Sequence, residues 1–106
     1  MKIYLAGPIS GLEPKVCRKL FNDAEKRLKK NKHTVINPWK LDQKMGDLPT
    51  WADYLKRDIP LLIKCDGILL LEGWEFSKGA NLEAYIADQL GIGRVDSNGD
   101  PLVREI

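Results

Sequence analysis

Two carboxylates stand on helix faces that should otherwise be apolar. On a helical wheel of residues 78–90, Glu83 falls in the middle of the apolar arc, and polar side chains take the opposite side. On a wheel of residues 51–63, Asp58 lies near the centre of the corresponding arc. The two arcs consist of Ala80, Leu82, Ala84, Ile86, Ala87 and Leu90, and of Trp51, Tyr54, Leu55, Ile59, Leu61 and Leu62.

A structural explanation exists for any single residue of this kind: its carboxylate caps a neighbouring backbone N–H or pairs with a lysine. Two such residues on consecutive helices favour a functional explanation, because desolvation raises the pKa of a carboxyl group toward values useful for proton transfer. A carboxylate pair suits cleavage at an anomeric carbon, where one acid is the nucleophile and the other protonates the leaving group. We therefore treat Glu83 and Asp58 as candidate catalytic residues.

The elements that must position these carboxylates follow from the hydrophobic pattern, which alternates between strand and helix. It predicts strands at 2–7, 33–38, 67–73 and 93–95, helices at 14–30, 50–64 and 78–90, and a polar loop at 39–49. This order predicts a parallel sheet with helices on both faces. The expected fold class is α/β, a three-layer sandwich of flavodoxin-like topology with strand order 2-1-3-4.

The C-terminal segment breaks this alternation. Residues 96–100 are rich in turn formers and separate the 93–95 strand from the segment Leu-Val-Arg-Glu-Ile at 102–106. This gap is too short for a parallel crossover, so we expect a short hairpin-like extension. The whole chain, residues 1–106, is expected to form one domain.

Two glycine-rich loops flank the point where the predicted strand order reverses. Residues 7–11 follow the first strand and residues 72–80 follow the third, and ligands of open parallel sheets bind outside these carboxyl ends. Where such a loop leads into a helix, its backbone N–H groups can bind an anion such as phosphate. Ser77 is a plausible N-cap whose hydroxyl could instead serve a ligand. The glycines have a structural alternative, since tight turns with positive φ also require them.

The sequence lacks the motifs of several other kinds of site. Residues 7–11 do not have the spacing or the Lys-Ser/Thr ending of a P-loop, and residues 91–96 lack the dinucleotide fingerprint. The sequence contains no Gly-x-Ser-x-Gly elbow, and His33 is its only histidine, which leaves little for metal or triad chemistry. We therefore expect neither a metal nor a cofactor.

Composition and charge are those of an ordinary soluble globular protein. Hydrophobic residues make up 43% and charged residues 30% of the chain. The net charge of +2 is too small to indicate binding to a nucleic acid polymer or a membrane, and the lysine-rich residues 26–33 are interpreted as the solvated end of a helix.

Without a signal peptide or an apolar stretch of membrane-spanning length, we expect a cytoplasmic protein. Cys17 and Cys65 are expected to stay unpaired.

Four segments form a fairly specific ordered set. They are "IYLAGPISG", "VINPW", the spacing of Arg57, Asp58, Leu62, Cys65 and Asp66, and "GWEFSKGANLEAYIA". Together they resemble the nucleoside 2-deoxyribosyltransferase-like superfamily, over roughly residues 1–93. The resemblance is greatest to short, often phage-associated members of uncharacterised function, and it is also clear to the 2'-deoxynucleoside 5'-phosphate N-hydrolases.

The resemblance implies roles for matching positions. Glu83 matches the nucleophile that attacks C1' of the sugar, Asp58 the acid that protonates or orients the departing base, and Tyr4 the first-strand tyrosine near the nucleophile. The first loop corresponds to residues near the sugar and its 5' end, and the second contains the phosphate-contacting turn of the N-hydrolases. The implied substrate-binding residues in these two loops are Gly7, Ile9, Ser10, Gly11, Trp74, Ser77 and Gly79.

The function expected from these residues is cleavage or exchange at the N-glycosidic bond of a (deoxy)nucleoside or its 5'-monophosphate. A non-catalytic nucleotide-binding or regulatory protein that keeps the pocket is the alternative. A third possibility is an interaction module that contacts a partner through Trp39, Trp51 or Trp74, although tryptophans more often form core or pocket walls. The shortened tail and the apolar second and third helices lead us to expect a homodimer or higher homo-oligomer.

Overall fold

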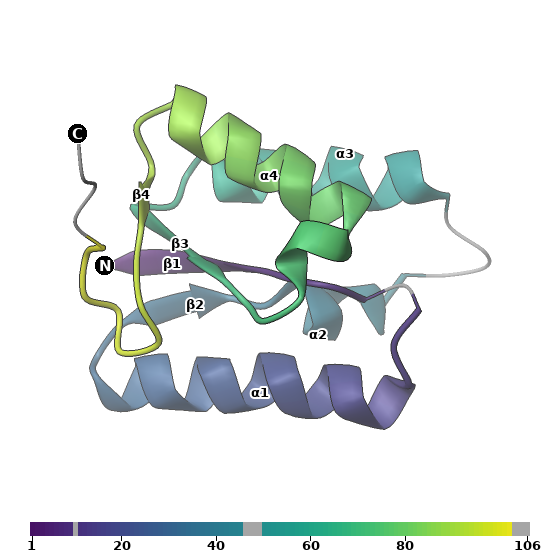
Figure 1. Cartoon of the computed structure of the whole chain (residues 1–106), viewed down its shortest axis with the longest axis horizontal. Helices are drawn as coiled ribbons and strands as arrows, with labels where there is room; N and C mark the ends of the chain where they lie inside the picture. Colours follow the sequence, from purple (N-terminus) through teal and green to yellow (C-terminus); the bar gives the residue numbers. More distant parts are fainter. Residues whose placement is uncertain (10, 46–49, 103–106) are drawn as a thin grey trace.

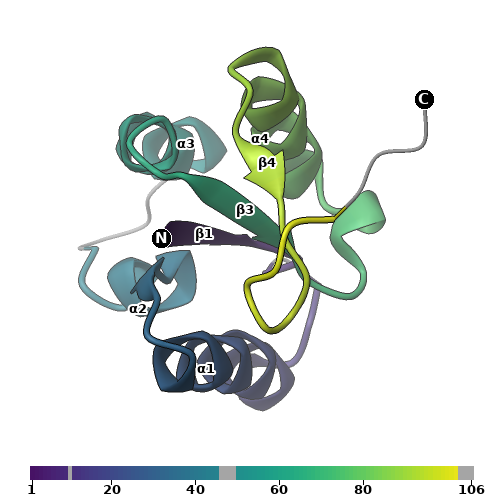
Figure 2. The same ribbon diagram turned by 90° about the vertical axis from the view of Figure 1, so that its left-hand side faces the viewer.

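A parallel sheet organises the molecule. The computed structural model describes residues 1–9, 11–45 and 50–102. Its strands are β1 (Lys2–Ala6), β2 (Thr34–Ile36), β3 (Gly67–Leu70) and β4 (Gly93–Arg94). They pair in parallel in the order β2-β1-β3-β4 (Figures 1 and 2), which confirms the predicted topology. The α/β fold class is therefore correct.

Helices cover both faces of this sheet. The helix α1 (Pro14–Lys30) lies on one face, and α3 (Trp51–Leu62) and α4 (Lys78–Gln89) lie on the other, whereas the short helix α2 (Pro38–Asp42) follows directly after the end of β2 (Figures 1 and 2). Local signals fix where α3 and α4 begin: Thr50 and Asp53 form a reciprocal capping box at α3, and Ser77 caps α4. Both helices thus begin at the end of the molecule where β1 and β3 finish.

The alternation of side chains along β1 divides the core into two clusters. Ile3 and Leu5 join the apolar cluster beneath α1, whereas Tyr4 and Ala6 join the cluster beneath α3 and α4. Since Tyr4 is fully buried, its hydroxyl is directed into the layer that carries the two candidate carboxylates. The register of one strand therefore places a polar group inside the core.

One predicted loop is partly helical. Residues 39–49 were expected to form a polar loop, but Pro38–Asp42 form the short helix α2. Asn37 caps it by accepting a hydrogen bond from the Lys40 backbone N–H, and Pro38 occupies the first turn, where its missing N–H costs nothing. This combination was visible in the sequence, and α2 brings Asp42 toward the sheet edge.

The C-terminal extension has the expected hairpin character as far as it is described. Val95 forms an antiparallel bridge with Pro101, and the Leu102 N–H donates to the Arg94 carbonyl. Residues 103–106, which the sequence also assigned to this return, lie outside the described residues. Within the described part of the chain, the helices are all too short or too polar to span a membrane.

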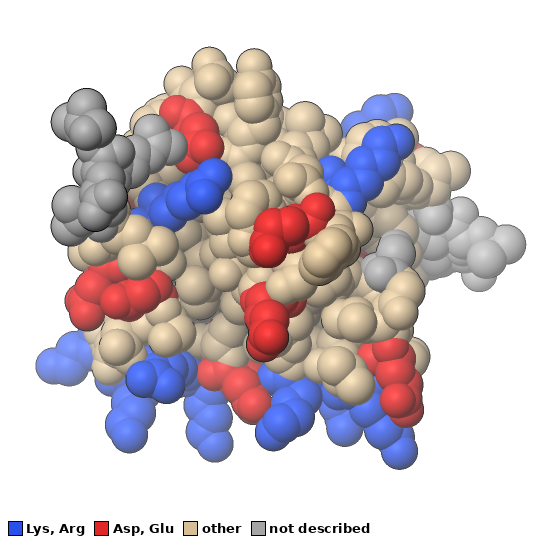
Figure 3. All heavy atoms as spheres, in the orientation of Figure 1, with Lys and Arg blue, Asp and Glu red and all other residues tan. Residues whose placement is uncertain are grey.

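Basic side chains gather on the solvent side of α1. They form a row along the lower edge of the molecule in Figure 3, and the last turn of α1 carries Arg27, Lys29 and Lys30. Lys29 pairs with the buried Glu25 at 2.6 Å, and the other charges face solvent. The arrangement fits the interpretation of residues 26–33 as a solvated helix end, where cations oppose the helix dipole.

Candidate functional site

The two predicted carboxylates are both buried, and they come from adjacent helices. Glu83 of α4 and Asp58 of α3 are each 6% exposed. The Tyr4 hydroxyl on β1 donates a hydrogen bond to Oε2 of Glu83. Three elements that are distant in sequence thus bring together the three residues assigned to catalysis by the resemblance. Of the two structural roles considered for Glu83, neither a helix cap nor a lysine pair is found among its described contacts.

Asp58 belongs to a cluster of charged residues that also contains Arg57 and Asp42. Arg57 Nε donates to Asp58 Oδ1 at 2.7 Å, and its Nη2 reaches Asp42 Oδ1 at 2.5 Å. The same Nη2 lies 2.5 Å from Asp58 Oδ1 and 3.5 Å from the Pro38 carbonyl. One guanidinium therefore joins α3 to α2 and holds one oxygen of each carboxylate.

Burial shifts the titration of these groups. Desolvation raises the pKa of Glu83 to about 8, against the opposing effect of the hydrogen bond from Tyr4. Desolvation also raises the pKa of Asp58, and the hydrogen bond from Arg57 opposes that shift. For Tyr4, burial first and the neighbouring Glu83 second raise the pKa of the phenol. All three groups therefore favour their neutral forms more strongly than they would in water.

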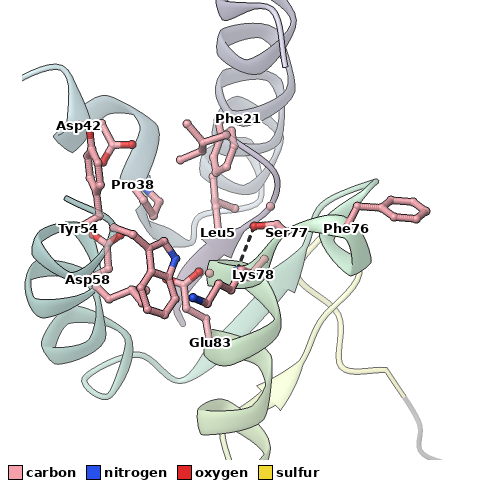
Figure 4. A pocket seen from close by; sticks show the side chains of 16 residues that line it. Leu5, Phe21, Pro38, Asp42, Tyr54, Asp58, Phe76, Ser77, Lys78 and Glu83 are labelled. Carbon is pink, nitrogen blue, oxygen red and sulfur yellow. Dashed lines mark hydrogen bonds between the residues drawn. The ribbon is translucent and has the colours of Figure 1, made fainter. Parts of the chain in front are cut away.

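A cavity of about 360 Å³ opens beside the carboxylates, a size within the range of roughly 300–1,000 Å³ that is usual for small-molecule sites. Glu83 lies between one side formed by Asp42, Tyr54 and Asp58 and another formed by Ser77 and Lys78 (Figure 4). The remaining wall is mainly apolar and includes Leu5, Gly7, Ile9, Phe21, Pro38, Trp51, Leu55, Gly79 and Ala80. Such a cavity can hold an aromatic ring next to a few polar groups.

The second loop supplies the start of α4. The Ser77 hydroxyl accepts a hydrogen bond from the Ala80 N–H at 3.2 Å, so it serves as the N-cap. Lys78 Nζ lies 4.0 Å from the ring centroid of Trp51, which joins the first turns of α4 and α3. Phe76 stands at the cavity mouth but is 92% exposed and points away from the cavity (Figure 4).

The substrate-binding residues expected from the sequence fall into three groups. Gly7, Ile9, Ser77 and Gly79 line the cavity, whereas Gly11 does not and adopts a positive φ of 83° in its turn. Ser10 lies outside the described residues. Gly7 also has a packing role, because a Cβ there would come within 2.9 Å of Leu71 Cβ. Glycine thus lets the ends of β1 and β3 approach each other.

Trp74 lies away from the cavity that the sequence assigned it to. It begins the single turn η1 (Trp74–Phe76), where the Arg94 guanidinium carbon lies 5.4 Å from its ring centroid. It packs against the apolar cluster beneath α3 and α4 and is not among the lining residues. Trp74 therefore lies outside the candidate site.

Several lining residues were missed as site residues by sequence reasoning. Trp51 and Tyr54 were read as part of the apolar arc of their helix, yet both line the cavity. Asp42, which also lines the cavity, falls in a segment that the sequence predicts as a loop. Arg57 does not line the cavity but holds Asp42 and Asp58, and the sequence singles it out only as part of a motif. Recognising Asn37-Pro38 as a helix start would have placed Asp42 on an element; nothing in the sequence pairs it with Arg57.

Comparisons with solved structures identify the fold. A 2-deoxyribosyltransferase from the psychrotolerant bacterium Bacillus psychrosaccharolyticus aligns with a TM-score of 0.72 at 22% identity, covering 97% of this chain and 77% of that one. A conserved protein from Enterococcus faecalis V583 aligns with a TM-score of 0.64 at 21% identity, covering 90% of this chain and 61% of that one. The fold is that of the nucleoside 2-deoxyribosyltransferases, as the sequence predicted.

Sequence comparisons match the chain to a family whose description names no activity. No curated protein matches the chain. The profile of one family, a domain of unknown function designated DUF4406, matches residues 1–95 and so includes every candidate catalytic residue. The match spans every strand and α-helix in the described part of the chain. The chain therefore belongs to the DUF4406 family.

Proposed function

We propose that this protein cleaves, or exchanges the base at, the N-glycosidic bond of a nucleoside or its 5'-monophosphate, with Glu83 as the nucleophile. The observation that carries this proposal is the convergence of Glu83, Asp58 and the Tyr4 hydroxyl beside one cavity of ligand size. The similarity in fold to a 2-deoxyribosyltransferase supports it.

The first step forms a covalent intermediate. A Glu83 carboxylate oxygen attacks C1' of the sugar, the bond from C1' to the base nitrogen breaks, and its electron pair leaves with the base. Protonated Asp58 gives its proton to that base. The products of this step are the free base and a glycosyl ester of Glu83. The raised pKa of Asp58 suits this role, because it keeps the acid protonated to higher pH.

The second step releases the sugar. Water attacks C1', transfers a proton to the Asp58 carboxylate, and the Glu83 carboxylate departs unchanged. When the N–H of a second base attacks in place of water, Asp58 takes that proton and the outcome is base exchange. Tyr4 donates to one oxygen of Glu83, which fixes the orientation of the carboxyl group and stabilises the negative charge that attack requires.

The opposite end of the cavity suits a 5'-phosphate. There α4 begins with Ser77, Lys78 and Gly79, all of which line the cavity. The first N–H groups of a helix lack intrahelical partners, and together with the helix dipole they favour an anion. We therefore assign the monophosphate, when the substrate carries one, to this end.

The decisive experiment is to incubate the protein with a panel of nucleosides and 5'-monophosphates and measure free base. Glu83→Gln keeps the shape of the side chain but cannot attack C1', so base release should fall by at least about a thousandfold while ligand binding remains. Asp58→Asn should lower it by about 10²–10⁴-fold, the usual contribution of a general acid. Asp23→Asn, an exposed change on α1, is the matched control and should leave base release unchanged.

Trapping the intermediate tests the assignment of the nucleophile. A slowly reacting substrate should leave a glycosyl ester that peptide mapping by mass spectrometry locates on Glu83. The high pKa of Glu83 is the observation that favours reversed roles. An ester found on Asp58 would make Glu83 the acid and overturn the assignment.

A nucleotide-binding protein without turnover is the second candidate. The same high pKa favours it, because a carboxyl group that is protonated at neutral pH is a poor nucleophile. In that case the wild-type protein would retain nucleotide and release no base at any pH. If Glu83 is the nucleophile, base release should instead increase as the pH rises toward about 8.

A further inference from the structure

The cluster of Asp42, Arg57 and Asp58 presents carboxylates, and not its guanidinium, to the cavity. Asp42 and Asp58 both line the cavity, whereas Arg57 does not. Arg57 also donates to the Pro38 carbonyl at 3.5 Å and to Met45 Sδ at 2.9 Å. It uses Oδ1 of each carboxylate, so neither Oδ2 depends on it. A ligand at this end of the cavity therefore meets two hydrogen-bond acceptors whose positions are fixed by Arg57.

The cluster lies at the end of the cavity where the base would sit. Asp42 and Tyr54 lie on one side of Glu83, and Ser77 and Lys78 lie on the other (Figure 4). The proposed reaction puts C1' next to Glu83 and the 5' end at the start of α4. The base must then extend toward Asp42 and the ring of Tyr54. This orientation rests on the proposed function.

We infer that Asp42 is a specificity-determining residue that selects nucleobases carrying an exocyclic amino group over their keto counterparts. Burial raises the pKa of Asp42, but the Arg57 guanidinium at 2.5 Å opposes that shift and favours the ionised form. An ionised carboxylate only accepts hydrogen bonds, so it pairs with an amino group but repels a carbonyl oxygen at the same position. Asp58 is not equivalent, because it carries the proton for the leaving base. The side chain of Asp42 is only 11% exposed, so water cannot readily replace a missing donor, and an unmatched keto base is penalised.

Two substrate pairs isolate this chemistry. Cytosine and uracil differ by an amino group in place of a carbonyl, and adenine and hypoxanthine differ in the same way. We expect the wild-type protein to release base from deoxycytidine or deoxyadenosine about 10- to 100-fold faster than from deoxyuridine or deoxyinosine, measured as kcat/KM. In each pair the base with the amino group should be preferred, whether the cavity accepts pyrimidines or purines.

Asp42→Asn tests the residue itself. The amide keeps the shape of the carboxylate but can also donate, so the preference within each pair should fall to about threefold or less, through faster reaction of the keto substrate. Asp23→Asn makes the same chemical change at an exposed position on α1 and should keep the full preference. A melting curve checks that Asp42→Asn is folded; if it is not, the preference of the wild-type protein alone decides.

The outcomes separate this inference from the proposed function. Equal rates for amino and keto substrates, or an unchanged preference in Asp42→Asn, would overturn the inference while leaving the glycosidic reaction in place. Absence of base release from every substrate would overturn the function, and the dissociation constants of the same pairs with Glu83→Gln would then decide the inference. A tenfold or greater preference for amino ligands in that binding assay supports it, and equal or undetectable binding contradicts it.

Discussion

At the scale of single residues, the burial of Glu83 has a consequence for stability that is independent of any substrate. The folded protein holds the Glu83 proton to about pH 8, whereas the unfolded chain releases it near the ordinary value of 4.5. Between these values the folded state binds more protons, so this group lowers the free energy of unfolding as the pH rises, by at most about 1.4 kcal/mol per unit. We expect wild-type protein to melt at progressively lower temperature across this window.

Glu83→Gln should remove that dependence. Its melting temperature should match the wild type near pH 5, where both side chains are neutral, and exceed it above pH 8, where wild-type Glu83 is a buried charge. Paired thermal melts from pH 5 to 9 measure the difference. A variant that is less stable than wild type throughout the range would mean that Glu83 is ionised in the folded state and stabilised by Tyr4, contrary to this prediction.

At the scale of elements, the start of α4 combines a structural and a binding role in Ser77. Its hydroxyl caps the helix, so Ser77→Ala should cost about 1 kcal/mol of stability. It should also weaken binding of a 5'-monophosphate more than binding of the parent nucleoside, because a frayed first turn no longer holds its N–H groups toward an anion. Calorimetric titration of both ligands into each protein gives the comparison.

The start of α3 offers a matched control. Thr50 caps α3 through the Asp53 N–H and does not line the cavity. Thr50→Ala should therefore lose comparable stability without a change in the ratio of monophosphate to nucleoside affinity. Equal losses for the two ligands in Ser77→Ala would place the phosphate elsewhere.

At the scale of the whole molecule, exposed apolar side chains on α3 and α4 predict self-association. Trp51 is 44% and Tyr85 62% exposed, and both lie on the same helical layer (Figure 2). Facing copies of these helices would bury them across a two-fold axis. We expect a dimer at tens of micromolar by sedimentation velocity, and Tyr85→Lys should shift it toward monomer.

Val16→Lys is the control for this experiment. Val16 is similarly exposed, at 51%, but lies on α1 and hence on the other face of the sheet. A dimer that survives Tyr85→Lys but dissociates in Val16→Lys would assign the interface to α1. A wild-type monomer at this concentration would contradict self-association through either layer.

What the sequence determined is local or periodic. Strand β1 reads as an uninterrupted apolar run, the caps of α3 and α4 lie where their residue types indicate, and the wheels put Glu83 and Asp58 on buried faces. The parallel direction of the strands follows from the length of the connections and the preference for right-handed crossovers. These features depend on neighbouring residues and on the number of residues between elements, both of which are written in the sequence.

What only the tertiary structure decided is which side chains meet. The hydrogen bond between Tyr4 and Glu83 joins positions 79 residues apart, and the pairing of Arg57 with Asp42 depends on how α2 packs beside α3. The contact of the Trp74 ring with Arg94 also depends on how segments distant in sequence pack together. Periodicity fixes the face on which a side chain lies but not its neighbour across an interface, because that neighbour is set by sheet register and by helix packing over the whole core.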